Sequence, residues 1–143
     1  MNFNLKENFQ KKTIGFYLGL IAAVLGLVSL IIFAVYSTKN NGTSGWVYAA
    51  LILAILVEIS LFFLNEKISD IVAIAAPILY FVALGEELHT GVGNIVDSFQ
   101  GIVMFGNASL ASTNIMLAIL LGIAGLISIV GCFLKKEKDT VQA

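Results

Sequence analysis

Long uninterrupted apolar runs dominate the pattern of this chain, and four of them stand out. They cover residues 14–36, 46–64, 68–84 and 115–134. A helix that crosses a bilayer needs about 20 apolar residues, within a range of about 17–25, so three runs are long enough and the third is at the short end. The runs lack the polar face of a helix in a soluble bundle. The pattern therefore predicts an all-α fold, a four-helix transmembrane bundle that forms one membrane domain over 1–143.

Composition supports a membrane as the solvent of this chain. Hydrophobic residues make up 59% of the sequence and charged residues 12%, whereas soluble domains carry about 45–50% and about 25%. The first expected partner is therefore the lipid bilayer. The formal net charge of -1 gives no reason to expect nucleic acid as a partner.

The lysines predict how the bundle is oriented. Four spans would place seven of them on one side: Lys6, Lys11, Lys12, Lys67, Lys135, Lys136 and Lys138. The opposite side would carry only Lys39. Because cytoplasmic segments are enriched in basic residues, we expect both termini in the cytoplasm and the protein in the plasma membrane.

The second outer loop, residues 85–113, contains an amphipathic pattern. Its apolar positions recur at helical spacing: Val92, Ile95, Val96, Phe99, Ile102 and Val103. This predicts a short helix over residues 91–105 that lies on the outer membrane surface or folds over the mouth of the bundle. Two roles remain open at this point, a lid over the spans and a binding surface for a partner or ligand.

Small residues form a stripe on two of the predicted spans. The first span contributes Gly15, Gly19, Ala22 and Gly26, and the fourth contributes Ala118, Gly122 and Gly125. Small residues allow the close approach that drives helix association in lipid. We expect the first and fourth spans to pack together along these stripes; the alternative is a contact with another subunit.

Glu58 is the ionisable residue that most needs an explanation, because it lies near the middle of the second span. A charge at the centre of a spanning helix costs about 2.5–3.5 kcal/mol, so the side chain should face the bundle interior or a partner. Tyr80, Ser29 and Ser128 are its expected hydrogen-bond partners. Three interpretations stay open: a proton or cation site, a protonated side chain bonded to a neighbouring helix, and a docking contact with another protein.

Two further features of the third span bear on function. Pro77 cannot donate a backbone hydrogen bond and predicts a kink. Glu86, Glu87 and His89 are residue types that bind metals, but their spacing matches no metal motif, so we expect solvated interface residues and no metal. The sequence contains no phosphate loop, zinc motif or nucleophile motif, and we expect neither a cofactor nor an enzyme.

Two functions from different classes follow. The first is a non-enzymatic accessory or assembly subunit that binds a larger membrane protein. The second is a homo-oligomeric transporter or channel that uses Glu58 as a proton or cation site. A single isolated carboxyl favours the first.

Overall fold

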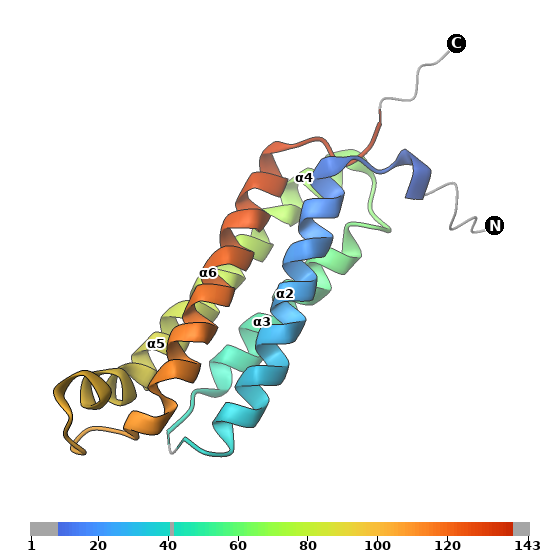
Figure 1. The fold of residues 1–143 in the computed structure, drawn as a ribbon. Helices are drawn as coiled ribbons and strands as arrows, with labels where there is room; N and C mark the ends of the chain where they lie inside the picture. Colours follow the sequence, from blue (N-terminus) through green and yellow to red (C-terminus); the bar gives the residue numbers. More distant parts are fainter. Residues whose placement is uncertain (1–8, 41, 139–143) are drawn as a thin grey trace, which may run out of the picture.

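Four helical segments run side by side in the computed structural model, which describes residues 9–40 and 42–138 (Figure 1). They are α2 (Ile14–Ser37), α3 (Gly45–Ser60), α4 followed by α5 (Glu66–Ala73 and Ala75–Gln100) and α6 (Ala111–Phe133), which a short 3-10 helix, η1 (Ala108–Leu110), precedes. The described residues form no β-strand apart from one isolated bridge. The predicted all-helical class is therefore confirmed.

Three helical segments are long and apolar enough to cross a membrane: Ile14–Ser37, Lys67–Gln100 and Ala108–Phe133. The segment Gly45–Ser60 is shorter, at 16 residues. At 1.5 Å per residue it spans about 24 Å, against about 30 Å of bilayer hydrocarbon. The apolar turn 61–64 extends it. These helices identify the chain as a membrane-embedded protein.

The helices form a closed ring in which α2 packs against α3 and α6, and α5 packs against α3 and α6. Helices α3 and α6 therefore face each other across the bundle axis, as do α2 and α5. Every side chain that joins such a diagonal pair lies at the centre of the bundle. This arrangement decides where the polar residues of the helices meet.

Helix α3 ends at Ser60, four residues before the end of the predicted span 46–64. The Ser60 hydroxyl donates to the carbonyl of Val57 at 2.7 Å. The backbone amides of Phe62 and Phe63 then bond to the carbonyls three residues before them. Because i to i+3 bonds tighten the chain beyond an α-helix, the last apolar residues form a turn.

The predicted kink at Pro77 appears as a break in the third helical segment. Helix α4 ends at Ala73 and α5 begins at Ala75, with Ile74 between them. Pro77 has no amide hydrogen to donate to the carbonyl of Ala73, and its ring crowds that carbonyl. The backbone therefore leaves the α-helix one residue after Ala73.

The third helical segment does not end near residue 84, so the predicted separate outer helix 91–105 is wrong. Helix α5 continues to Gln100 and ends at Gly101, whose φ of +66° is the left-handed conformation that glycine adopts most easily. Its last turns, gold in Figure 1, turn aside from the bundle axis. Ile102 and Val103 lie beyond the helix.

The predicted apolar face of residues 91–105 points away from the bundle, which does not fit a helix folded over the bundle mouth. Val92, Phe99 and Val103 are 54%, 82% and 86% exposed, whereas Asn94 and Asp97 are buried. Ile95, Val96 and Ile102 are not buried either. The reason is that a helix in lipid turns its polar side inward and its apolar side outward, the reverse of a helix on a soluble core.

Candidate functional site

Glu58 lies at the centre of the bundle, on the diagonal between α3 and α6. Its side chain is 4% exposed. The Ser128 hydroxyl of α6 donates to Oε1 of Glu58 at 2.5 Å. The other carboxylate oxygen lies against Gly19 of α2, where a Cβ atom would overlap it. Of the expected hydrogen-bond partners, the structure therefore brings Ser128 to Glu58.

Tyr80 and Ser29, the other expected partners, bond elsewhere. The Tyr80 hydroxyl of α5 donates to the carbonyl of Ala22 across the second diagonal, at 3.0 Å. The Ser29 hydroxyl donates to the carbonyl of Leu25 in its own helix. Tyr80 thus binds about one helical turn beyond Gly19, next to the Glu58 level, without sharing a hydrogen bond with Glu58.

The glycines of α2 provide room for these side chains. A Cβ atom at Gly26 would meet the ring of Tyr80, and one at Gly15 would meet the carbonyls of Leu134 and Lys135. The stripe on α2, with Ala22 fully buried among these residues, therefore serves the bundle interior. This agrees with an internal packing role.

The stripe on α6 does not face α2 as expected. A Cβ atom at Gly125 would meet the Phe81 ring of α5, and one at Gly122 would meet nothing within 4 Å. Ala118 is likewise only half-buried. Although α2 and α6 do pack together, the glycine of α6 that faces α2 is Gly131, which lies against the backbone of Gly15 and Gly19.

A second polar cluster lies toward the end of the bundle that is opposite the chain termini. The Asn114 amide of α6 donates to Oε1 of Glu87 at 2.6 Å and to the Tyr36 hydroxyl at 3.0 Å. Nδ2 of Asn94 in α5 lies within hydrogen-bond distance of Asn114, Tyr36 and Asn40, at 2.9 to 3.1 Å, and its two hydrogens are shared among these three acceptors. Glu87 is fully buried, and its Oε2 has no hydrogen-bond partner among the described residues.

This cluster separates the residues that resembled metal ligands. Glu87 points into the bundle, whereas His89 is exposed on another side of α5 and Glu86 is half-buried. Within 9–40 and 42–138, no three His, Cys, Asp or Glu side chains gather closely enough to bind a metal ion. Glu87 therefore belongs to an amide cluster and not to a group with His89.

Asp97 fixes the loop that follows α5. Its carboxylate accepts the backbone amides of Met104, Phe105 and Gly106 at 2.9 to 3.0 Å. Sequence reasoning missed this residue and Asn94, because it took only the apolar positions of the predicted outer helix as candidates. A polar residue every three or four positions along the apolar segment from Glu87 onward was the signal that identifies this inner face.

We expect Asp97→Asn to loosen this loop, because the amide keeps one acceptor oxygen but loses the charge. Backbone amide exchange at Met104, Phe105 and Gly106 should become about tenfold faster, the change that corresponds to losing one charge-assisted hydrogen bond. Hydrogen exchange read by mass spectrometry measures it. The control Glu86→Gln makes the same charge change on the same helix and should leave the loop unchanged; equal protection in Asp97→Asn would contradict the assignment.

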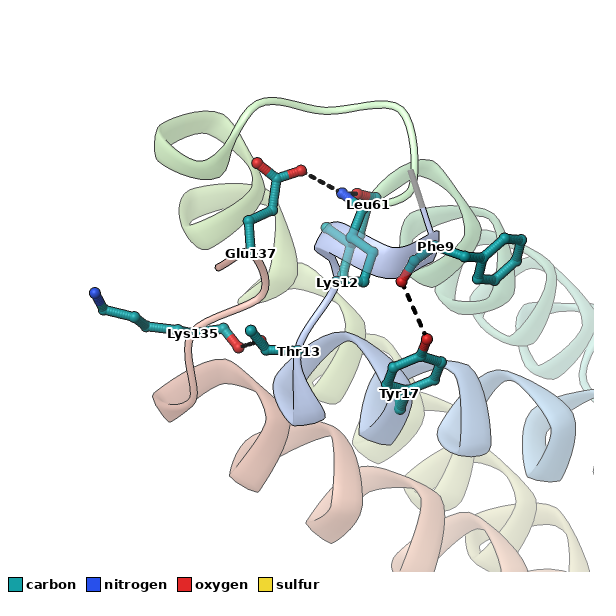
Figure 2. Close-up of polar contacts among 7 residues, drawn as sticks. All are labelled: Phe9, Lys12, Thr13, Tyr17, Leu61, Lys135 and Glu137. Carbon is teal, nitrogen blue, oxygen red and sulfur yellow. Dashed lines mark hydrogen bonds and ion pairs between the residues drawn. The ribbon is translucent and has the colours of Figure 1, made fainter. Parts of the chain in front are cut away.

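The two ends of the described chain meet in a small clasp (Figure 2). The Lys12 ammonium donates to Glu137 at 2.5 Å and to the carbonyl of Leu61 at 3.3 Å. The Thr13 hydroxyl donates to the carbonyl of Lys135. Both ends thus lie beside the turn after α3, at one end of the bundle. A four-span chain requires this placement.

A second ion pair strengthens the same end. Lys136, which is 1% exposed, binds the Asp70 carboxylate of α4 at 2.9 Å. Lys39 lies beyond the other end of α2 and pairs with no carboxylate in the described part of the chain. Lys6 falls outside the described residues.

Comparisons with known proteins give no independent indication of function. No protein-family model, curated protein or solved structure matches this chain significantly. The function must therefore be argued from the geometry alone.

The two buried carboxyls are separated by a mostly apolar layer, in which the buried hydroxyls of Ser29 and Tyr80 donate to backbone carbonyls. On α6, Asn114 and Ser128 lie 14 residues or about 21 Å apart, and the inward residues between them include Leu117, Leu121 and Ala124, all fully buried. On the facing helices, Phe33, Leu51 and Ala83 are also fully buried. The Glu58 site and the Glu87 cluster are therefore two separate polar sites.

Proposed function

We propose that this chain is a non-enzymatic accessory or assembly subunit of a larger membrane complex. The observation that carries the proposal is the mostly apolar layer between Glu58 and Glu87, because a transport path needs available polar groups along its length and the Ser29 and Tyr80 hydroxyls in this layer already donate to backbone carbonyls. In a single copy, that layer separates both carboxyls from each other. The polar side chains then serve to hold four helices in one arrangement.

The proposed setting is a four-span protein in the plasma membrane with both ends in the cytoplasm. The clasp at Lys12 supports an even number of spans. The lysine asymmetry supports the cytoplasmic side for the termini. In this setting α3 crosses the bilayer with the help of the apolar turn 61–64.

The outward side of α6 is the surface we propose for the partner. Gly122 meets nothing within 4 Å, and Ala118 beside it is only half-buried. Small residues that no helix of the bundle covers allow another helix to approach closely. This retains the alternative role that the sequence left open for the α6 stripe.

We expect Gly122→Trp to fold normally and to lose the partner. The added ring would project from the outward side of α6 without meeting another helix of the bundle, and it would cover the surface proposed for the partner. The measurement is a tagged purification from the native membrane in mild detergent, with partners and stoichiometry read by mass spectrometry. Val130→Trp, at a 52% exposed position on the same helix, is the matched control and should retain the partner. A stoichiometric larger membrane protein that depends on Gly122 would support the proposal; a chain purified from its native membrane without any other protein would contradict it.

The second candidate, a homo-oligomeric proton or cation transporter, is favoured by one observation. Oε2 of Glu87 is buried without a partner among the described residues, and a proton or cation would satisfy it. Flux into liposomes that contain the purified protein tests this function. A flux that Glu58→Gln and Glu87→Gln both abolish would favour transport over the accessory role.

A further inference from the structure

We infer that the bundle binds one anionic phospholipid, with an acyl chain in a groove between α2 and α6 and the headgroup at Lys39. The inference goes beyond the proposed function and requires only that the chain lies in a membrane. It concerns the end of the bundle that is opposite the chain termini. It rests on two adjoining cavities that share Lys39.

The first cavity is an apolar groove of about 310 Å³. Ile31 and Val35 of α2 form one wall, and Leu110 and Met116 form the other. Ile31, Val35 and Met116 are 59%, 56% and 45% exposed, so the groove opens to the side of the bundle. Within the membrane an acyl chain is already in hydrocarbon, so what the groove offers is close van der Waals packing between two helices, which also drives helix association in lipid.

The second cavity is a polar pocket of about 330 Å³ that shares Lys39 with the groove. Lys39 lines both cavities, and Asn40, Gly106 and Asn107 complete the polar wall. An ammonium offers three donors and each amide group two. Nδ2 of Asn40 is itself buried, so the donors that the pocket offers to a ligand come from the exposed residues Lys39 and Asn107.

The lining of the two cavities favours an anion, because Lys39 is the only charged residue among the described residues in it. The Lys39 ammonium has no carboxylate partner within the described ranges. Asp97, whose loop forms part of the pocket, already accepts three backbone amides. The pocket therefore combines an unpaired cation with amide donors, which suits the phosphate of a headgroup.

The position of Lys39 connects the headgroup with the chain. It follows the end of α2 at Ser37 by two residues, and the groove descends along the last two turns of the same helix. A phosphate bound at Lys39 would thus place its acyl chain beside Val35 and Ile31. A free phosphate would use the pocket only, whereas a phospholipid uses both cavities.

Native mass spectrometry of the protein released from nanodiscs tests the inference. The nanodiscs contain equal amounts of phosphatidylglycerol and phosphatidylcholine, and the measured quantity is the fraction of protein that retains one phosphatidylglycerol. We expect Lys39→Gln to weaken this binding about fivefold, from about 1 kcal/mol per lysine near a membrane surface. Lys67→Gln removes an exposed lysine at the other end of the bundle and should change nothing.

A second pair of variants tests the groove. Val35→Trp fills it and should reduce phosphatidylglycerol retention, whereas Val24→Trp, at an equally exposed position of α2 (55%), should not. Retention that is equal for the two lipids, or equal in Lys39→Gln and the wild-type protein, would overturn the inference. The inference would also be overturned if soluble glycerol phosphate displaced phosphatidylglycerol completely and Val35→Trp retained as much phosphatidylglycerol as the wild-type protein. The groove would then play no part in binding. The assay uses purified protein without any partner. A negative result would therefore overturn the lipid site and leave the proposed partner surface at Gly122 untouched.

Discussion

Glu58→Lys should prevent the bundle from forming, while Glu58→Gln should leave it intact. A lysine at the centre of the span costs about 2.5–3.5 kcal/mol to insert, and the neutral Ser128 hydroxyl can accept a hydrogen bond from the ammonium but cannot neutralise its charge. The Ser128 hydroxyl, at 2.5 Å from Oε1, can still donate to the amide oxygen of a glutamine. Because Gly19 leaves no space beside the carboxyl, the longer lysine side chain cannot bypass it.

The measurement is the fraction of monodisperse protein in mild detergent, read by size-exclusion chromatography of a fluorescent fusion. Glu58→Gln should give the same monodisperse fraction as the wild-type protein. The change alters one neutral hydrogen bond, which contributes about 1 kcal/mol to the free energy of unfolding. Glu86→Lys, a half-buried position on α5, is the control for adding a lysine. Well-folded Glu58→Lys protein would mean that the side chain faces water or lipid headgroups and that the central site is wrongly placed.

The second large effect is expected for Asn94→Leu, because leucine has a similar shape but no polar atoms. Nδ2 of Asn94 shares its two hydrogens among Tyr36, Asn40 and Asn114, and Oδ1 accepts the backbone amide of Asn107 at 2.6 Å. Each buried partner that loses its bond costs about 1–3 kcal/mol. The change should therefore lower the free energy of unfolding by about 3 kcal/mol or more.

Thermal unfolding in detergent, followed by helical circular dichroism, measures this loss. The matched control is Gln100→Leu, which removes the same amide from an exposed position at the end of the same helix, and it should be close to neutral. An Asn94→Leu protein as stable as Gln100→Leu would show that the amide cluster does not hold the helices together.

These two sites differ in how far the sequence predicted them. Glu58 was identifiable because it is a charge inside an otherwise apolar run, and Ser128 lay on the small-residue side of another run. Which of three hydroxyls would reach Glu58 could not be predicted, because that depends on the diagonal placement of α3 and α6. Apolar runs predict that spans exist, but not which ones are neighbours.

The Glu87 cluster shows where the sequence argument failed. The residues from Glu86 to Asp97 are polar enough to interrupt an apolar run, so this segment was assigned to a loop and a surface helix. In the structure, Ala83, Glu87, Asn94 and Asp97 continue the inward side of α5. The same periodicity fits a surface helix and a buried polar face, and only the packing of α6 with its Asn114 decides between them.

The central claim, four spans with both ends on the cytoplasmic side, is tested most directly by labelling cysteines with a membrane-impermeant thiol reagent in sealed right-side-out cells. The variants are Gln10→Cys, Lys138→Cys and Ser109→Cys, all at exposed positions, in a Cys132→Ser background. We expect labelling of Ser109→Cys alone, with the other two labelled only after the membrane is permeabilised. Labelling of one terminus but not the other would mean that α3 does not cross the bilayer, and this result would contradict the four-span account.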